Sequence, residues 1–494
     1  MPDQYILLPR RGLVSSAGAA ASVLTALPRA RSTSAPIEAL IAVPDQPKRP
    51  IRVLDSIQEN GPKLVELDGG VARSINDPRS PVRALPLVTY ARPEPRRSPA
   101  GSGQSGPTTT PVSMRVTVRD AVTAAGVPGA TVVAFTDFAN GLGAQGLSDA
   151  NGDVHLTLFA STVERLYCYS PPGYWGAFRT LLPLASLVLD VTPVDLSWTD
   201  GVRHYYGGSR FDPATGVTVG VIDTGVGPHA QLNVVGGRNT VTGEPATDWR
   251  DGDTHGTHVA GLIGAGGAPP TGLRGLAPGI PMHAYRVFPV GKGATNYAIL
   301  KAMIMAAADG CDIINLSLGG GPYDEIVEES IADARNQGML VVVAAGNDNR
   351  ATVSYPAAHL GATGISAIGV EGTFPTGSLE EADVQRPPAS SSDPNEFVAA
   401  FSNVGSGIDV TGPGVGALST LPNNQFGPMS GTSMAAPVVT GATACLLSRD
   451  APTYNMPRDR ARSDAIEQLL QSSCVRRGFG MRFEGYGLPD PGLV

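Results

Sequence analysis

The sequence has 494 residues, of which 42% are apolar and 16% charged, with a formal net charge of −8. This length exceeds one ordinary hydrophobic core, so several domains are expected, and the acidic balance without a basic stripe argues against nucleic acid as a partner. No run approaches the roughly 18 apolar residues of a membrane span. The four cysteines lack metal or redox spacing, which fits a reducing compartment slightly better than an oxidising one.

The first residues give no clear export signal. Arg10 and Arg11 precede a run of small residues, 13–27, that loosely resembles a twin-arginine signal. However, this run is only weakly apolar, and a strand-like stretch already precedes the arginines. The sequence therefore does not decide the cellular compartment, although a cytoplasmic location is slightly favoured over secretion.

Residues 1–92 predict a small α+β domain. Strands are expected at 5–9, 52–57, 62–67 and 82–91, and helices at about 34–42 and 70–77. This order is that of a split βαβ, or ferredoxin-like, fold. A disordered leader is the alternative, because 14–35 is rich in Ala and Ser. The Pro, Ser, Gly and Thr of 93–112 then predict a flexible linker.

Residues 113–195 change to β patterning. Alternating apolar residues at 114–118, 130–136 and 154–158, with a turn at 148–153, predict an all-β sandwich of seven or eight strands. The stretches VPGATVVAF and GLSDANGDVHLTL resemble the transthyretin-like or carboxypeptidase-regulatory sandwich. That resemblance implies a structural or adhesive role.

Residues 200–494 alternate strands with helices, which predicts an α/β domain whose parallel sheet is covered on both faces. Strands are expected at 217–222, 285–288, 313–318 and 339–344, and helices at 255–265, 297–308, 325–337 and 432–447. Function in such sheets gathers at the carboxyl ends of the strands. The Pro-rich and acidic segment 371–398 predicts a surface loop, with a position beside a substrate cleft as the less favoured alternative.

Three polar residues stand where chemistry is expected: Asp223 ends a strand, His255 opens a helix, and Ser433 lies in the first turn of another helix. The ordinary explanations are that Asp223 is a turn residue, that His255 belongs to a metal site with His258, and that Ser433 is a helix N-cap. No further ligand pattern completes a metal site. A serine is a weak nucleophile until a base removes its proton, and the order Asp, His, Ser is one known order of a catalytic triad.

Three longer motifs support this interpretation. GVIDTGV (220–226), HGTHVAG (255–261) and GTSMAAP (431–437) together resemble the subtilisin-like serine proteases, the subtilases or peptidase family S8. DIINLSLGG (312–320) and VVVAAGN (341–347) are also similar to that family. The resemblance implies a parallel-sheet catalytic domain and a serine endopeptidase that acts on polypeptides.

The resemblance also implies roles for individual residues. Asp223 would orient the imidazole of His255, which would act as general base and then acid, and Ser433 would form the acyl-enzyme. Asn347 would supply the oxyanion-hole amide. The substrate-binding residues implied are Ser317, Leu318, Gly319 and Gly320, which would pair with the substrate backbone, and Ala344, Ala345 and Gly346, which would line the pocket before the scissile bond. The chemistry requires no cofactor. Structural calcium is common in the family, but no ligand loop is matched.

The N-terminal domain gains a role from the same comparison. PVRALPLVTYARP (81–93) resembles subtilase propeptides, which implies an inhibitory domain whose tail lies in the cleft and is cut by the enzyme itself. A cut within 93–112 would keep the sandwich in the mature enzyme, whereas a cut at 196–208 would remove it; the linker is favoured. The alternative function is a latent or self-cutting domain that serves mainly in binding. The sequence leaves the oligomeric state open.

Overall fold

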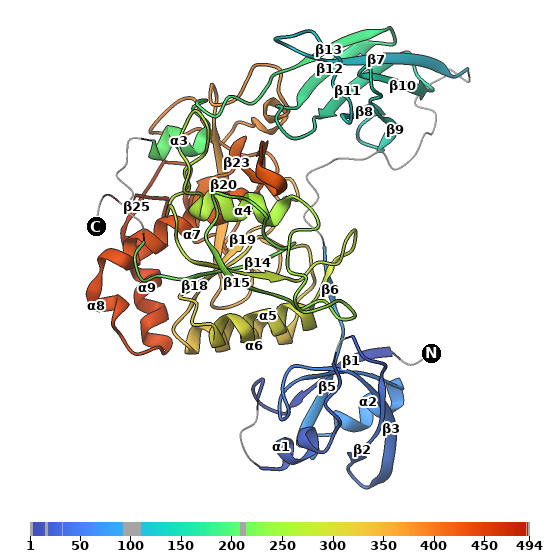
Figure 1. Cartoon of the computed structure of the whole chain (residues 1–494), viewed down its shortest axis with the longest axis vertical. Coiled ribbons are helices and arrows are strands. Elements are labelled where there is room, and N and C mark those ends of the chain that lie inside the picture. Colours follow the sequence, from blue (N-terminus) through green and yellow to red (C-terminus); the bar gives the residue numbers. More distant parts are fainter. Residues whose placement is uncertain are drawn as a thin grey trace.

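The computed structural model describes residues 3–14, 18–31, 33–91, 110–207, 214–490 and 492. Most of the predicted linker, 93–109, lies outside the described residues. Figure 1 shows a central α/β unit with an N-terminal α/β unit at one end and a β-sandwich at the other. Of the described helices, none combines the length and apolarity needed to cross a membrane.

The N-terminal unit is an antiparallel sheet with two helices on one face. The strand order is β2-β3-β4-β1-β5. The strands are β1 (Asp3–Pro9), β2 (Ile37–Val43), β3 (Gln46–Ser56), β4 (Lys63–Leu67) and β5 (Val82–Pro86), and the helices are α1 (Gly18–Thr25) and α2 (Gly69–Ile75). Alternation along β1 divides its side chains: Leu7 packs toward α1 and α2, whereas Ile6 and Leu8 pack against the central unit.

The expected helix at 34–42 is wrong. This segment forms the edge strand β2, which pairs with β3 through a tight turn at Asp45, where φ is +53°. Helix-permitting residues yield to the hairpin because pairing with the neighbouring strand β3 overrides their weak helix propensity. The helix of this region lies earlier, at α1, within the stretch for which disorder was the alternative.

The sandwich contains seven described strands in two sheets, β10-β7-β13 and β12-β11-β8-β9. They are β7 (Val112–Asp120), β8 (Thr131–Asp137), β9 (Leu142–Leu147), β10 (Asp153–Leu158), β11 (Thr162–Tyr169), β12 (Ala177–Pro183) and β13 (Leu187–Val191). Alternate residues such as Val116, Val132 and Leu156 fill the space between the sheets. The predicted turn is present, since the Asp149 carboxylate accepts hydrogen bonds from the backbone N–H groups of Asn151 and Asp153.

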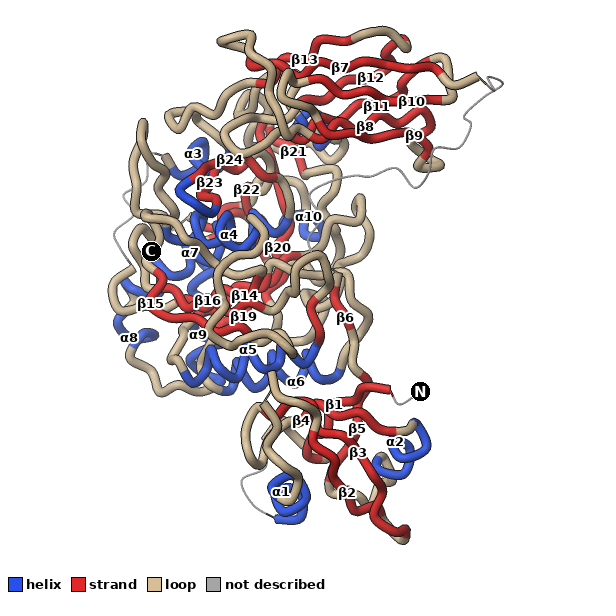
Figure 2. Tube along the Cα trace, turned by 45° about the vertical axis from the view of Figure 1, so that its right-hand side comes forward, coloured by secondary structure: helices blue, strands red, loops and turns tan. Residues whose placement is uncertain are grey.

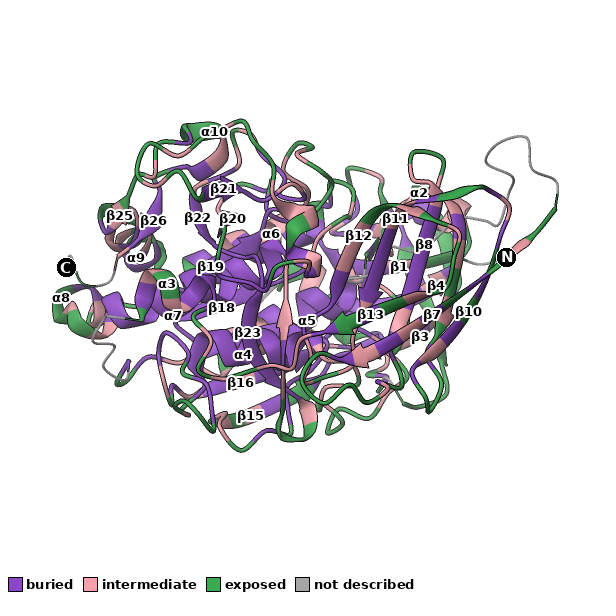
Figure 3. Ribbon diagram, turned by 90° about the horizontal axis from the view of Figure 1, so that it is seen from above, coloured by how far each residue is buried: buried purple, intermediate pink, exposed green. Residues whose placement is uncertain are grey.

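The central sheet confirms the predicted α/β fold. Its order is β15-β16-β14-β18-β19-β20-β21, and β22 also pairs with β20; all these pairings are parallel except that of β20 with β21. The strands are β14 (Val219–Asp223), β15 (Val234–Asn239), β16 (Met282–Arg286), β18 (Ile313–Leu316), β19 (Leu340–Ala344), β20 (Thr363–Val370), β21 (Glu396–Val398) and β22 (Val410–Pro413). Figure 3 shows the inner strands of this sheet as buried, whereas the edge strand β15 is only partly buried.

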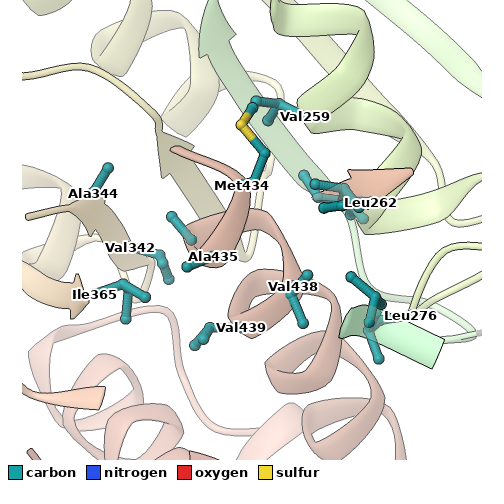
Figure 4. Packing of buried hydrophobic residues seen from close by; sticks show 14 of the residues in the cluster. Val259, Leu262, Leu276, Val342, Ala344, Ile365, Met434, Ala435, Val438 and Val439 are labelled. Atoms are coloured by element: carbon teal, nitrogen blue, oxygen red, sulfur yellow. The ribbon is translucent and has the colours of Figure 1, made fainter. Parts of the chain in front are cut away.

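Helices cover both faces of this sheet (Figure 2). α4 (His255–Gly264) and α7 (Thr432–Arg449) lie on one face, and α5 (Asn296–Ala308) and α6 (Glu325–Asn336) on the other. Side chains alternate along β14: Val221 packs on the face that α4 and α7 cover, and the next residue, Ile222, packs on the face that α5 and α6 cover. Figure 4 shows Ala435, Val438 and Val439 of α7 between α4 and the strands, where small side chains permit close packing.

The remaining elements surround this core. They are β6 (Thr89–Tyr90), α3 (Gly201–Tyr206), β17 (Ala294–Thr295), the 3₁₀ turns η1 (Leu379–Asp383) and η2 (Pro422–Asn424), the hairpin β23 (Ala417–Leu421) with β24 (Gln425–Met429), and α8 (Ala451–Tyr454), α9 (Arg460–Ser472), β25 (Cys474–Val475), α10 (Met481–Glu484) and β26 (Leu488–Pro489). The four cysteines all lie within the described residues and form no disulfide, and Cys311 and Cys445 are buried.

Candidate active site

Asp223 and His255 form a buried pair at the carboxyl end of β14. The His255 Nδ1–H donates to Asp223 Oδ1 at 2.8 Å, and Asp223 has no exposed surface. A carboxylate only accepts hydrogen bonds, so this contact places the ring proton on Nδ1. The opposite nitrogen, Nε2, is then the basic one.

The loop after β14 is tied to the first turn of α4. Thr224 Oγ1 accepts from the Gly256 backbone N–H at 2.9 Å and donates to Asp251 at 2.9 Å, while Asp251 also accepts from the Thr257 backbone N–H at 2.9 Å. Burial raises the pKa of the Asp251 carboxyl to about 6. Gly256 permits this close approach, because an added Cβ would collide with the Gly225 carbonyl oxygen. Sequence reasoning had singled out neither Thr224 nor Asp251.

Ser433 lies in the first turn of α7, with Gly431 at the N-cap position. Pro437 lacks the backbone N–H that would bond to the carbonyl of Ser433, four residues earlier. The Ser317 hydroxyl donates to that carbonyl instead, at 2.9 Å. The Ser433 hydroxyl donates to the Ser317 carbonyl at a long 3.4 Å. At 3.4 Å this contact is weak, so it does not hold the hydroxyl firmly in one orientation.

Asn347 follows β19 and reaches the start of α7. Its Oδ1 accepts from the Thr432 backbone N–H and from the Thr432 hydroxyl, both at 2.9 Å. These contacts assign the amide orientation, which leaves the two Nδ2 hydrogens as donors beside Gly431. A donor fixed next to the first turn of α7 suits a negative charge that develops near Ser433.

His258 belongs to the packing of α4. Its Nε2 hydrogen-bonds the carbonyl oxygens of Ala417 at 3.0 Å and Gly427 at 3.2 Å, and burial lowers the pKa of the ring to about 3. The ring is therefore a neutral donor to the β23–β24 hairpin. This geometry argues against the metal site that two histidines three residues apart had suggested.

The backbone of the N-terminal tail lies along the predicted substrate-binding strand. Ala91 pairs with Gly319 in antiparallel fashion, and Tyr90 pairs with Ala294 of β17. The tail is thus a strand between two segments of the central unit, close to Ser317. The Tyr90 side chain is fully buried in the same cluster as Leu318.

The other predicted substrate-binding residues lie at the end of β19 and just beyond it, or beside Ser317. Ala344 and Ala345 are buried, and the Gly346 backbone N–H donates to the Thr432 hydroxyl at 3.1 Å. Gly320 packs close to Ala91, since an added Cβ would lie 3.0 Å from that of Ala91. These residues therefore border Asn347 and the tail rather than lying elsewhere in the fold.

A cavity of about 400 Å³ opens beside these groups, between the central unit and the sandwich. Thr254, Asn347 and Ser430 line it from the active-site side, and Tyr167 and Tyr169 line it from the sandwich. Sequence reasoning missed the two tyrosines. Their spacing of two residues in a strand, which places both on one face, was the available signal.

The segment 371–398 is a surface loop only in part: 385–395 is mostly exposed, as its composition predicted, whereas η1 is packed against the sandwich. Leu379 and Ala382 of η1 pack against the sandwich cluster that contains Phe135 and Tyr167, and Leu379 and Glu380 line the cavity. This part of the segment therefore lies beside the cavity, which agrees with the less favoured alternative. The composition of the segment did not predict this, because one apolar face of a short 3₁₀ turn is enough to bury η1 in a mostly polar stretch.

Comparisons with known proteins agree with this geometry. A sequence profile described as the Subtilase family matches residues 214–488. Subtilisin BL of Lederbergia lenta is 36% identical over 242 residues, which cover 49% of this chain and 79% of that protein. Subtilisin DY of Bacillus licheniformis is 36% identical over 262 residues, 52% of this chain and 85% of that protein. Neither the N-terminal unit nor the sandwich lies within the range of the family profile.

Proposed function

Because the chain belongs to the subtilase family and is a serine endopeptidase, we propose that Asp223, His255 and Ser433 carry its chemistry. The buried 2.8 Å hydrogen bond from His255 to Asp223 supports this proposal most directly. It fixes the imidazole with Nε2 as the base, and Asp223 then stabilises the imidazolium that forms.

The steps follow from these positions. His255 Nε2 takes the proton of the Ser433 hydroxyl as Oγ attacks the carbonyl carbon of the substrate. The oxyanion that forms is stabilised by the Asn347 Nδ2 donors. His255 then protonates the leaving amine, and water hydrolyses the acyl-enzyme by the same route. These side chains need no cofactor, and structural calcium remains a prediction without assigned ligands.

We further propose that the N-terminal unit inhibits the uncut chain. Ala91 and Tyr90 occupy the strand that a substrate would use. Polar contacts hold them there: the Asn296 side chain bonds the backbone N–H of Val88 at 3.1 Å, and Lys301 forms a buried ion pair with Asp55 at 2.7 Å. Arg83 also pairs with Glu325 and Glu329 of α6.

Self-cleavage within 93–112 would release this inhibition and keep the sandwich. The hydrogen bonds between sandwich and central unit, such as Phe178 N–H to the Gly377 carbonyl at 2.9 Å, support retention. The Ser433→Ala variant, expressed alone and purified, should stay at full length, whereas the wild type should show a new N-terminus within 93–112 by mass spectrometry. A Ser433→Ala chain cut at the same place would contradict self-processing. A wild-type chain that is cut but never cleaves added polypeptide would favour the latent alternative.

A further inference from the structure

The β-sandwich presents an aromatic outer face to the central unit. Phe135, Tyr167, Tyr169 and Phe178 cluster on the β12-β11-β8-β9 sheet, with the rings of Tyr167 and Tyr169 stacked at 6.3 Å and those of Tyr167 and Phe178 4.9 Å apart. The outer face of a sandwich sheet ordinarily faces water and is polar. This one is covered in part by Leu379 and Ala382 of η1.

The sandwich is held in a fixed register against the central unit. The Gly173 backbone N–H donates to the Phe426 carbonyl at 2.9 Å, and the Arg179 guanidinium donates to the Gly377 carbonyl at 2.7 Å. Trp175 is fully buried in the hydrophobic core of the central unit. The aromatic face therefore has a definite position relative to the active site.

The cavity of about 400 Å³ lies where this face meets the active site. Tyr169 and Leu379 contribute apolar walls, and Thr254 and Asn347 form the end next to the catalytic groups. Its size is within the roughly 300–1,000 Å³ of ordinary ligand sites. It has room for a large side chain together with its backbone.

The proposed chemistry indicates which part of a substrate enters. Ala91 of the N-terminal tail pairs with Gly319, in the segment predicted to bind the substrate backbone, and Gly346, predicted to line the pocket before the scissile bond, bonds Thr432 beside Ser433; we therefore assign the acyl part of the substrate to this side. The leaving amine must lie near His255, because His255 protonates it. Thr254 precedes His255 and lines the cavity, so the chain beyond the scissile bond passes toward it.

We propose that the sandwich and η1 form a subsite for the leaving-group side of the substrate, selective for a large apolar, preferably aromatic, side chain within the first three residues after the scissile bond. This proposal rests on the proposed catalytic function of Ser433. It gives the sandwich a part in substrate recognition that its structural resemblance does not imply. Aromatic packing against the Tyr169 and Leu379 walls supplies the selectivity.

The test uses enzyme purified after the full chain has cut itself, with the concentration of active sites counted by fluorophosphonate labelling. Internally quenched peptides share one acyl side and carry Phe or Gly at the first, second or third residue after the scissile bond. The wild type should prefer Phe over Gly in kcat/KM by about tenfold or more at one of these positions. Dividing each value by that for a short peptide with an arylamide leaving group corrects for damage to the catalytic groups.

Tyr169→Ala, on the sandwich, and Leu379→Ala, on η1, should each reduce this preference to about twofold or less. Leu147→Ala is the matched control, since Leu147 is 66% exposed on the same sheet and does not line the cavity; it should keep the preference. A wild type without preference at any position, or a preference that survives both cavity variants, would overturn the subsite alone. A chain that never labels would overturn the catalytic proposal and the subsite together.

Discussion

At the level of single residues, Pro437 shapes the surroundings of the proposed nucleophile. It releases the Ser433 carbonyl from the helix ladder, and the Ser317 hydroxyl occupies that acceptor. The predicted substrate-binding segment and the first turn of α7 are thereby joined by the Ser317 side chain. The start of α7 is therefore fixed by a side chain from another segment, which the sequence around Ser433 does not indicate.

Asn347→Leu tests the proposed oxyanion donor. The substitution should lower kcat by about 10²–10³-fold with little change in KM, a magnitude known from such a donor in a subtilisin rather than obtained from this structure. Because it also removes the acceptor for the Thr432 N–H and hydroxyl, Thr432→Val serves as the control: it removes the hydroxyl contact with Asn347 but keeps the backbone contact and the amide donor, so its loss in kcat should be much smaller. Steady-state kinetics with a short peptide substrate measures both. Equal losses would contradict the donor role.

His258 predicts a pH dependence of stability. Burial lowers the pKa of its ring to about 3, whereas an unfolded histidine titrates near 6.5. Between these values the unfolded state binds the extra proton, so the free energy of unfolding should fall as the pH drops through this window, by up to about 1.4 kcal/mol per pH unit for this one group.

His258→Gln keeps a donor for the Ala417 and Gly427 carbonyls but does not titrate. In a Ser433→Ala background, which prevents self-digestion, the free energy of unfolding from urea titrations should depend less steeply on pH between 6.5 and 3 in the variant. Identical slopes with and without His258 would show that the ring does not remain neutral in the fold.

At the level of elements, β6 links the N-terminal unit to the cleft. It is a two-residue strand between β17 and Gly319, and the buried Tyr90 ring anchors it. Burial of a large aromatic side chain contributes about 2–3 kcal/mol. A strand this short therefore depends on its one side chain to stay in the cleft.

Tyr90→Ala should loosen the tail of the uncut chain. The rate of fluorophosphonate labelling of the full-length band, resolved on a gel, should rise by about tenfold or more, as expected from the lost burial. Thr89→Ala is the control, because Thr89 is exposed and its backbone pairing with Thr295 is retained. Labelling of the uncut Tyr90→Ala chain at the wild-type rate would argue against inhibition by this tail.

At the level of the whole molecule, the central unit lies between two units for which we propose opposite effects on substrate binding. The N-terminal unit packs its sheet onto α5 and α6 and sends β6 toward the proposed acyl side. The sandwich packs against η1 and borders the side toward His255. Figure 1 shows the two at opposite ends of the molecule. In this proposal the N-terminal unit blocks the substrate-binding strand, and the sandwich extends the substrate-binding site beyond the scissile bond.

Local patterns predicted most of the central unit. Asp223, His255 and Ser433 each stood at the end of a strand or the start of a helix, which periodicity and short motifs identify. The strand β2 was missed because pairing with its neighbour β3 overrides a weak helix propensity. The cavity wall formed by Tyr169 and Leu379 was missed because it joins segments far apart in the chain, and local sequence carries no record of such a partner.

The most direct test of the central claim is to locate the fluorophosphonate adduct. Wild-type chain should react once, and peptide mapping by mass spectrometry should place the adduct on Ser433; His255→Ala, which lacks the base but keeps the serine, should react far more slowly. An adduct on another residue, or equal labelling of folded Ser433→Ala, would contradict the assignment of Ser433 as the nucleophile.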